Sequence, residues 1–390
     1  VEVDGETLVL PYGCLKHVLT AGECEVVNEL PSDPPSVTFG ADIPLYDYQA
    51  EAVEALLEEY YGILQSPPGS GKTQMGIALA AALGRKTLWL THTHDLLTQS
   101  QRRAEQYMDT SLIGTITEGR VRIGKGITFA TVQTMCNLDL ARYQNVWDCV
   151  IVDECHRVAG TPTGVTQFSK VLNALAARHK YGLSATVHRS DGMIAATYAL
   201  LGDVAHKVPD EAVSDKVMTV GVLPRPTRIT VSRDFLDTDG TLIYAKLVNY
   251  LTEDFERNGL IINDLVMDEG HSCLILSDRL AHLEYLMGHL PRSMRSQAVM
   301  VSGSMTSKKA KALREQAIED MRQGRKRYLF ATYALAKEGL DIPRLDRLYL
   351  TTPQKDYAIV AQSIGRIARV FPGKEPPIAY DYVDAGVQYL

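Results

Sequence analysis

Short runs of consecutive apolar residues recur along the chain and alternate with stretches whose apolar positions follow a helical period. Such runs predict buried strands, and the stretches between them predict helices that cover the strands. Continuous apolar strands are typical of a parallel sheet with helices on both faces, so we expect an α/β fold. The predicted strands are residues 87–90, 127–130, 149–152, 181–184, 273–276, 298–301, 328–331, 348–351 and 378–383.

The same pattern predicts two lobes of similar size. The periodicity fades between residues 203 and 227, where three prolines interrupt it. We place a linker at 208–227, a first lobe at 41–207 and a second lobe at 228–390. Residues 1–40 show a different pattern, and we expect a small N-terminal accessory domain there. Helices are predicted at residues 50–60, 74–83, 279–290, 308–322 and 356–370.

Length and charge narrow the class of protein. A chain of 390 residues exceeds the usual size of a single core, so two or more domains are expected. The net charge of −7 argues against a wholly basic nucleic-acid coat, but it leaves room for a local basic track. No apolar run approaches the length of a membrane span, so we expect no membrane partner.

The cysteines and the first residue lead to two further expectations. The six cysteines include no C-x-x-C pair and no zinc spacing, which favours free thiols in a reducing, cytoplasmic compartment. The chain begins with Val1 rather than methionine, and we expect that its natural N-terminus is missing.

Residues 66–73 read SPPGSGKT and lie between an apolar run and the predicted helix at 74–83. A strand, a glycine-rich turn and a helix form the context that a phosphate-binding loop requires. Helix N-terminal N–H groups bind phosphate, and glycines let the backbone come close to it. We expect Lys72 to reach the β- and γ-phosphates of ATP and Thr73 to ligate Mg²⁺. The predicted cradle comprises Pro68, Gly69, Ser70, Gly71, Lys72 and Thr73.

Asp153 and Glu154 follow directly on the predicted strand at 149–152. Carboxylates at the carboxyl end of a parallel strand project into the crevice where ligands bind. We expect Asp153 to hold Mg²⁺ through water and Glu154 to orient and deprotonate the attacking water. An acidic pair after a strand is weak evidence alone, but it gains weight beside a phosphate loop in the same lobe.

Residues 362–369 read QSIGRIAR and lie in the second lobe. Gln362, Arg366 and Arg369 share one face of the predicted helix. Two arginines on one face also fit an ordinary solvated helix surface. If a nucleotide lies against them, they stabilise charge on the transferred phosphoryl group, with effects of roughly 10³–10⁵ in rate in comparable NTPases.

The phosphate loop, residues 153–156 (DECH) and QxxGRxxR occur in this order, and with them the chain resembles a superfamily 2 helicase of the DExH type. The resemblance covers residues 45–383. It implies two RecA-like lobes in tandem, ATP and Mg²⁺ as cofactors, and nucleic acid as the partner. It also implies that Arg366 and Arg369 complete the ATP site only when the lobes close, with Gln362 beside them.

Further residues match other motifs of this family. Tyr46 and Gln49 resemble the adenine-reading motif, in which Gln49 reads the base edge and Tyr46 stacks. Gly339 and Asp341 lie in a stretch that matches a second-lobe motif, and the resemblance implies nucleotide contacts for both. The expected coupling residues are His156, Ser184 and Thr186, and the expected nucleic-acid contacts are Thr93, Thr131, Thr134, Ser277, Arg279 and Thr332.

Within the superfamily, residues 182–186 with Arg189, Asp191 and Gly192 resemble the phage UvsW, XPB and RecG-like group. This resemblance implies a DNA helicase or translocase that acts on double-stranded, forked or branched DNA in repair and recombination. The sequence does not give the oligomeric state, and we expect a monomer. It would work in the cytoplasm of a bacterial or phage-infected host cell. The alternatives are an RNA helicase and an ATP-gated nucleic-acid clamp or assembly subunit. The basic stretch at 308–327 fits either a phosphate track or a solvated helix face.

Overall fold

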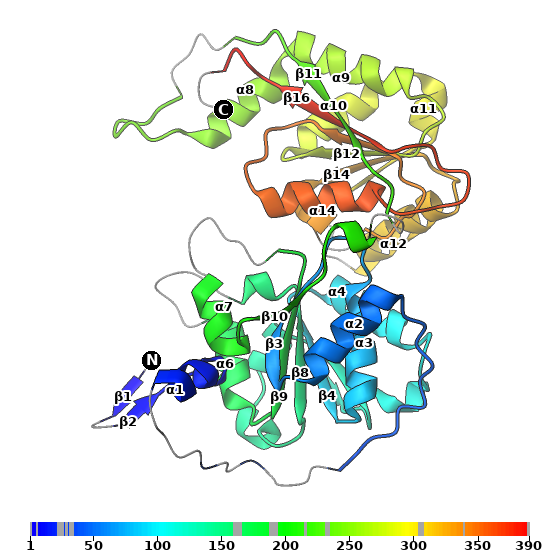
Figure 1. Ribbon diagram of the computed structural model, residues 1–390. Helices are drawn as coiled ribbons and strands as arrows, with labels where there is room; N and C mark the ends of the chain where they lie inside the picture. Colours follow the sequence, from blue (N-terminus) through cyan, green and yellow to red (C-terminus); the bar gives the residue numbers. More distant parts are fainter. Residues whose placement is uncertain are drawn as a thin grey trace. The chain divides into compact units, whose positions relative to one another are not determined.

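The structure is a computed structural model with two compact units, residues 1–213 and residues 214–390 (Figure 1). Each unit is built on its own sheet. The structure describes residues 2–4, 7–21, 27, 30, 35–158, 166–186, 194–213, 217–230, 235–302, 308–337 and 340–387.

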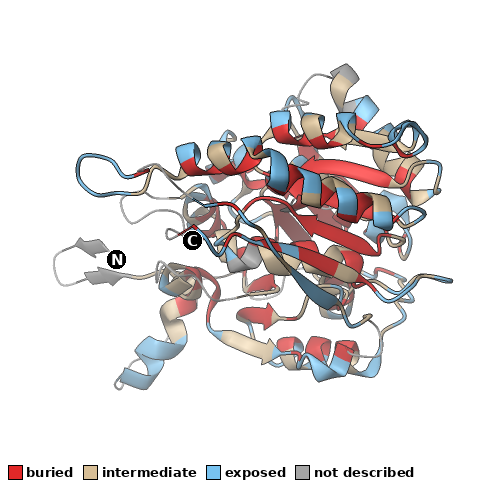
Figure 2. Cartoon of the chain, turned by 90° about the horizontal axis from the view of Figure 1, so that it is seen from above, coloured by how far each residue is buried: buried red, intermediate tan, exposed pale blue. Residues whose placement is uncertain are grey.

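The first unit carries an eight-stranded sheet within the described residues. Its strands are β3 (Tyr61–Gln65), β4 (Thr87–Thr91), β5 (Ile113–Thr117), β6 (Arg120–Arg122), β7 (Ile127–Thr131), β8 (Cys149–Asp153), β9 (His179–Ser184) and β10 (Val204–Lys207). They lie in the order β10-β3-β9-β8-β4-β7-β5-β6, and all pairs are parallel except β5 with β6. The central strands are apolar and buried along their length, whereas helices keep exposed outer faces (Figure 2).

The helices of the first unit follow these strands along the chain. They are α2 (Asp47–Leu57), α3 (Lys72–Leu83), α4 (His94–Ala104), α5 (Val132–Cys136), α6 (Gln167–Ala174) and α7 (Ile194–Leu201). α3 packs closely on the sheet because Gly76 has no side chain. A Cβ atom there would lie 2.7 Å from the rings of Trp89 and from Cδ1 of Leu183. This close packing fixes the helix that begins at the phosphate loop.

The N-terminal residues pack on the first unit. β1 (Glu2–Asp4) and β2 (Thr7–Val9) form an antiparallel pair, followed by η1 (Tyr12–Cys14) and α1 (Leu15–Ala21). η1 lies against α7, where a Cβ atom on Gly13 would meet backbone atoms at 2.4–2.7 Å. The N–H of Lys16 donates to the hydroxyl of Tyr61 at 2.8 Å. By its contacts this segment therefore belongs to the first unit.

The second unit carries a six-stranded, wholly parallel sheet within the described residues. Its strands are β11 (Gly221–Pro226), β12 (Cys273–Ser277), β13 (Ala298–Val301), β14 (Tyr328–Thr332), β15 (Arg347–Leu350) and β16 (Ile378–Val383). They lie in the order β11-β16-β15-β12-β14-β13. When strands are numbered along each unit, leaving aside β6 and β10, both sheets read 1-6-5-2-4-3. The two units therefore repeat one topology.

Seven helices among the described residues accompany this second sheet: α8 (Tyr244–Glu253), α9 (Phe255–Met267), α10 (Leu280–Gly288), α11 (Arg292–Ser296), α12 (Lys308–Arg322), α13 (Tyr333–Lys337) and α14 (Tyr357–Ile367). A buried ion pair ties α9 to the carboxyl ends of β15 and β16. Arg257 donates to both oxygens of Asp384, at 2.9 and 3.1 Å, and to the Thr351 carbonyl at 2.8 Å. No helix in the described part of the chain is long and apolar enough to cross a bilayer.

The structure confirms the predicted α/β fold with two parallel-sheet lobes in tandem. β13 and β16 have the predicted bounds, and the other predicted strands differ by one or two residues at an end. The boundary between the units lies at residues 213–214, but β11 also falls inside the range predicted as a linker. Pro224 and Pro226 obscured this strand. They fit there because β11 is an edge strand that pairs with β16 alone.

Candidate nucleotide and nucleic-acid sites

The loop at residues 66–71 joins β3 to α3 and has the geometry of a phosphate cradle. Gly69 and Gly71 have φ angles of 84° and 83°, in the left-handed region that favours glycine. A Cβ atom on Gly71 would lie 2.5 Å from Nε2 of Gln49, so a side chain there would displace the Gln49 amide. α3 begins at Lys72, directly after the turn, and its first N–H groups have no partner within the helix. The loop therefore presents backbone donors to an anion.

Ser66 stands where the strict phosphate-loop pattern has glycine, and its side chain braces the loop. Ser66 is fully buried, and its hydroxyl donates to Oγ of Ser70 at 2.6 Å. Nζ of Lys72 donates to the Ser66 carbonyl oxygen at 3.4 Å. An ammonium group has three donors, so this one long bond leaves Lys72 able to bind phosphate.

Gln49 links the phosphate loop to the start of α2. Its Oε1 accepts from the Tyr46 N–H at 3.0 Å, and its Nε2 donates to the Ser70 carbonyl at 2.7 Å. Tyr48, for which the sequence suggested no role, donates to the same carbonyl at 3.0 Å. Tyr46 is half exposed and stacks on Tyr48 with ring centroids 5.9 Å apart. The Gln49 amide keeps one N–H and one lone pair, so adenine reading by Gln49 stays a prediction.

Asp153 and Glu154 lie at the carboxyl end of β8. Oδ1 of Asp153 accepts from the Glu154 N–H at 3.0 Å, and Oδ2 accepts from Oγ of Ser100 at 3.3 Å. Burial, together with the Glu154 carboxylate, raises the pKa of Asp153 to about 7, and Lys72 acts in the opposite direction. Glu154 has a φ of 52°, the one positive value at a non-glycine residue in the described ranges. Backbone strain of this kind persists where surrounding structure enforces it, often at functional sites.

The predicted coupling residues lie together beside Glu154. Nδ1 of His156 lies 3.3 Å from Oε2 of Glu154 and 3.1 Å from Oγ of Ser184. Ser184 in turn donates to the Thr186 carbonyl at 2.5 Å and accepts from the Thr186 N–H at 3.2 Å. β8 and β9 are neighbouring strands, which explains why residues distant in sequence meet. Residues 187–193, which include Arg189, Asp191 and Gly192, lie outside the described residues.

The donor set fits Mg²⁺ bound together with a nucleotide. No group of three or more His, Cys, Asp or Glu side chains in the described ranges could hold a metal alone. Mg²⁺ in nucleotide sites uses one or two protein ligands, several waters and the substrate phosphates. Thr73 in the first turn of α3 and the Asp153 carboxylate supply such ligands. A cation bound there would offset both the burial of the Asp153 carboxylate and its repulsion by Glu154, the two causes of its raised pKa.

Two of the three predicted nucleic-acid threonines of the first unit, Thr93 and Thr131, are helix caps at the carboxyl end of the sheet, and the third, Thr134, lies within α5. Thr93 caps α4, with Oγ1 accepting from the Leu96 N–H at 3.3 Å. Thr131 caps α5, with Oγ1 accepting from the Thr134 N–H at 3.3 Å. Gln133 joins the two loops by donating to the His92 carbonyl at 2.9 Å. β4 and β7 are neighbours, so both caps lie at adjacent strand ends. Their contact with nucleic acid stays a prediction.

The structure brings together two predicted nucleotide residues of the second unit. Arg369 forms an ion pair with Asp341. Lys374, which no sequence pattern singled out, donates to the Ile367 and Arg369 carbonyls at 2.6 and 2.7 Å and so caps the end of α14. Burial lowers the pKa of Lys374 to about 8.

The other members of this predicted group lie nearby on α14 or outside the described residues. Nε of Arg366 donates to the Ala336 carbonyl at 3.3 Å, which joins α14 to α13. Oε1 of Gln362 is buried and has no hydrogen-bond partner in the described part of the chain. Gly339 lies outside the described residues.

Ser277 does not fit the predicted contact with nucleic acid. It is fully buried, its Oγ accepts from the Arg279 N–H at 3.1 Å and it bonds Nδ1 of His282 at 3.0 Å. Burial, with a contribution from Arg257, lowers the pKa of His282 to about 3, so the ring is neutral. Ser277 therefore holds the turn into α10 and has no free surface. Sequence could not show this, because the bond partner His282 is itself held by a bond to Oδ1 of Asn258 on α9, at 2.9 Å.

Arg279 and Thr332 stay predicted nucleic-acid contacts. Nε of Arg279 donates to Oδ1 of Asn249 at 2.6 Å, and Nη2 donates to the Ala245 carbonyl at 3.2 Å, so α8 holds the guanidinium group. Thr332 is partly buried and ends β14, directly before α13.

The arginines at the end of the basic stretch are paired with acids. Arg325 donates to Oδ1 of Asp320 at 2.6 and 2.8 Å, and Nη1 of Arg322 lies 3.4 Å from Glu319. These pairs, one within α12 and one between α12 and the turn that follows it, favour the solvated-face interpretation over a phosphate track for this end of the basic stretch.

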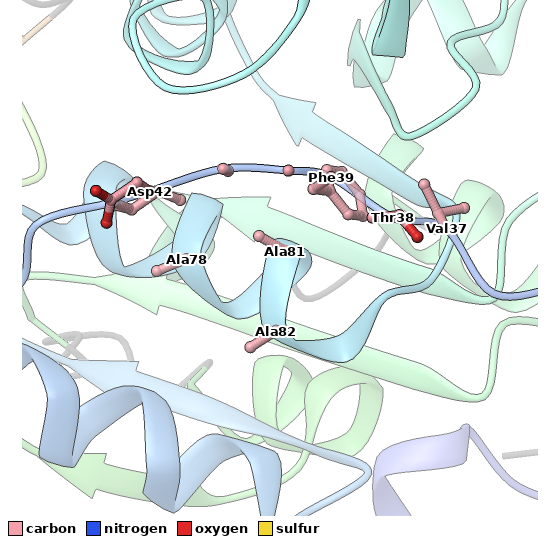
Figure 3. A pocket seen from close by; sticks show the side chains of 10 residues that line it. Val37, Thr38, Phe39, Asp42, Ala78, Ala81 and Ala82 are labelled. Atoms are coloured by element: carbon pink, nitrogen blue, oxygen red, sulfur yellow. The ribbon is translucent and has the colours of Figure 1, made fainter.

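A pocket of about 680 Å³ lies between residues 37–43 and α3 (Figure 3). The alanines at positions 78, 81 and 82 line its helix side, and Val37 and Phe39 line the other side. Asp42 is the one titratable side chain in this lining. Because the pocket lies along the middle and last turns of α3, away from the phosphate loop, we assign no chemistry to it.

These features together define an NTPase with a phosphate loop in the first of two RecA-like units. Comparison with known proteins agrees with this class. Residues 42–189 match the family model described as "Type III restriction enzyme, res subunit", and residues 258–371 match "Helicase conserved C-terminal domain". The matches fall in the first and second unit, respectively. Each unit thus matches a family model found in helicases or related enzymes, and these matches support a helicase of superfamily 2.

Curated relatives carry both DNA and RNA names. The probable helicase D10 of Escherichia phage T5 is 26% identical and covers 83% of this chain and 68% of its own length. A candidate ATP-dependent RNA helicase, L396, of Acanthamoeba polyphaga mimivirus is also 26% identical, with 83% and 60% covered. The DNA 3'-5' translocase XPB2 of Sulfurisphaera tokodaii is 30% identical, with 54% and 46% covered. The chain thus spans about half to two thirds of the length of these relatives.

Solved structures show the same fold. S. cerevisiae Dbp5 bound to RNA and ADP BeF3 aligns with a TM-score of 0.62 at 17% identity, covering 87% of this chain and 84% of Dbp5. The DNA-bound Type ISP restriction-modification enzyme LlaBIII aligns with a TM-score of 0.61 at 18% identity, covering 88% of this chain and 28% of that enzyme.

Proposed function

We propose that the protein is an ATP-driven DNA translocase or helicase that acts on duplex, forked or branched DNA. The observation that carries the proposal is that several predicted site residues gather at the carboxyl end of the first unit's sheet. The phosphate loop, the Asp153–Glu154 pair, the His156–Ser184 contact and the threonine caps all follow strands of this one sheet. Parallel strands end at the same edge, so nucleotide chemistry and a nucleic-acid surface are neighbours on one rigid element.

In this proposal the residues of the first unit bind ATP and activate water. The N–H groups around Gly69 and Gly71 bind phosphate, and Lys72 approaches the β- and γ-phosphates. Mg²⁺, when bound, neutralises charge on the β- and γ-phosphates. Thr73 and Asp153 hold that ion, while Glu154 accepts a proton from the attacking water. His156 contacts both Glu154 and Ser184, so a movement of the Glu154 side chain is transmitted through His156 to the end of β9.

Further residues, in the second unit and at the start of α2, are proposed to act on the nucleotide. Arg366 and Arg369 stabilise charge on the phosphoryl group, and Gln362 orients water or phosphate beside them. Arg369 is paired with Asp341, and in this proposal a nucleotide phosphate is a second anionic partner for its guanidinium group. Gly339 and Asp341 contact the nucleotide, Tyr46 stacks on adenine and Gln49 reads its edge.

We propose DNA rather than RNA as the substrate because of the names and sources of two relatives. The translocase XPB2 is named for DNA, and the helicase D10 comes from a phage. RNA is the second candidate, because the relative L396 is named for RNA.

The described cysteines are free thiols, which supports the proposed cytoplasmic location.

The test is the ATPase rate measured against the length of duplex DNA, single-stranded DNA and matched RNA, alongside strand exchange on a forked DNA. A translocase shows a rate that rises with DNA length until dissociation ends each run. Binding should tolerate changes of sequence and weaken steeply with salt, because phosphate contacts dominate. Stimulation that does not depend on length, without strand exchange, indicates a clamp. Stronger stimulation by RNA indicates an RNA helicase.

A further inference from the structure

α4 joins the two predicted sites of the first unit. Its N-terminus is capped by Thr93, at the edge where nucleic acid is proposed to bind. Seven residues later, Ser100 lies on the buried face of the helix and is 2% exposed. Oγ of Ser100 donates to Oδ2 of Asp153 at 3.3 Å. A rise of 1.5 Å per residue separates the cap from this bond by roughly 10 Å of rigid helix.

The hydroxyl of Ser100 is not needed for packing. Serine is less favourable than alanine inside a helix, and it commonly donates to the carbonyl four residues earlier, which here belongs to Leu96. Ser100 instead donates to Asp153. Its neighbours on the buried face are Leu97 and Ala104, so an alanine at position 100 would suit both the helix and the core.

The bond completes the support of the Asp153 carboxylate. Its other oxygen, Oδ1, accepts from the Glu154 N–H at 3.0 Å. The carboxylate is thus held once by its own loop and once by α4. If α4 shifts along its axis, the bond to Oδ2 changes length, and the carboxylate can turn about its remaining bond.

The N-terminal end of α4 is also tied to the neighbouring nucleic-acid loop. Gln133 donates to the His92 carbonyl at 2.9 Å, and Oγ1 of Thr91 donates to the Thr93 carbonyl at 3.0 Å. A ligand that orders these two loops therefore acts directly on the start of α4.

We propose that Ser100 is a positioning residue that couples nucleic acid at the N-terminus of α4 to the orientation of Asp153. The inference rests on the proposed nucleic-acid-dependent ATPase. It requires that Mg²⁺–nucleotide and nucleic acid change each other's affinity by the same factor, as linkage demands. Without the Ser100 hydroxyl, both sites persist but their mutual effect weakens.

Ser100→Ala tests the coupling by equilibrium binding. The dissociation constant of a labelled duplex DNA and of a matched RNA is measured with and without a non-hydrolysable ATP analogue and Mg²⁺. The ratio of the two constants is the coupling factor. We expect this factor to fall roughly tenfold in Ser100→Ala, because a hydrogen bond to a charged group is lost. The nucleic-acid stimulation of ATP hydrolysis should fall by a similar factor.

Thr98→Ala is the matched control. Thr98 is on the same helix, but its hydroxyl donates to the His94 carbonyl at 2.9 Å rather than to Asp153. Thr98→Ala should keep the wild-type coupling factor, and Ser100→Thr should restore most of it, because threonine keeps the hydroxyl. The melting temperature of Ser100→Ala should stay within a few degrees of the wild type, since helix propensity offsets the lost bond.

Three results would overturn the inference. A wild-type coupling factor in a folded Ser100→Ala protein shows that the bond between Ser100 and Asp153 does not couple the two sites. An equal loss in Thr98→Ala shows that the helix as a whole, rather than the bond, is responsible. A fall in melting temperature together with weaker binding of each ligand alone shows a structural role. If the wild-type protein itself shows no linkage and no stimulation by DNA or RNA, the proposed function fails as well.

Discussion

The two units of this protein share a strand order but differ in the residues at the carboxyl end of each strand. β3 leads into a glycine-rich phosphate loop, whereas β11, the first strand of the second sheet, leads into Thr227 and Arg228. β8 ends in Asp153, whereas the corresponding strand β15 is followed by Thr351 and Thr352, which are buried. The same scaffold therefore carries a glycine-rich loop and an acidic strand end in the first unit, and neither at the corresponding described positions of the second.

One pair of positions stays alike in the two units. β7 ends in Thr131 and β14 ends in Thr332, and each strand is followed by a five-residue helix. These are the positions at which nucleic-acid contacts are predicted in both units. The difference between the units teaches that topology fixes where loops gather, while a few loop residues decide the chemistry.

The largest expected effect is on ATP hydrolysis, and it tests the phosphate loop that the first unit has and the second lacks. Lys72→Ala should abolish ATP hydrolysis while leaving the fold intact, because Lys72 is a partly exposed phosphate ligand rather than a core residue. Arg228→Ala removes an exposed charge from the corresponding loop of the second unit and should keep the wild-type rate. Turnover by purified Lys72→Ala near the wild-type rate contradicts the phosphate-loop assignment. Circular dichroism checks the fold.

The next-largest expected effect tests whether the second unit contributes to ATP hydrolysis. Arg366→Ala and Arg369→Ala should each lower the turnover number by roughly 10³–10⁵, with little change in ATP affinity. Single-turnover hydrolysis and equilibrium binding of a fluorescent nucleotide measure the two quantities separately. Arg344→Ala, a nearby arginine that stacks on Phe371, is the control. Equal losses in affinity and turnover would show that the arginines only bind nucleotide.

Glu154→Gln tests the acidic end of β8, which has no counterpart at the end of the corresponding strand β15. The variant should bind ATP but hydrolyse it roughly 10²–10⁴ times more slowly, because the general base is lost. It should therefore hold nucleic acid more tightly in the presence of ATP. Glu105→Gln, on the exposed end of α4, should behave as the wild type. Loss of ATP binding in Glu154→Gln would assign Glu154 a structural role instead.

The smallest effect concerns stability rather than chemistry. Asp384→Asn breaks the buried pair with Arg257 at the carboxyl edge of the second sheet. The free energy of unfolding of this unit should fall by about 3–5 kcal/mol, because a buried arginine loses its counter-charge. Hydrogen exchange should accelerate in β12 and β15 and stay unchanged in β4 and β8. Faster exchange in both sheets alike would show that the units do not unfold independently.

Sequence alone determined the central strands and the identity of the phosphate loop. Both signals are local, since an apolar run predicts a buried strand and the residues of SPPGSGKT are consecutive. The strands β5, β6, β10 and β11 were not predicted, and three of them lie at a margin of their sheet. β6 carries two arginines and β11 two prolines, and each is a strand because it pairs with one neighbour.

Tertiary structure decided which residues meet and which are hidden. The contact of His156 with Ser184 depends on β8 lying beside β9, and the burial of Ser277 depends on His282 and α9 packing over its turn. No sequence pattern singled out Ser100, because serine is common on helices and its partner lies 53 positions away. Distance in space is set by the order of strands in the sheet, and a one-dimensional pattern does not contain that order.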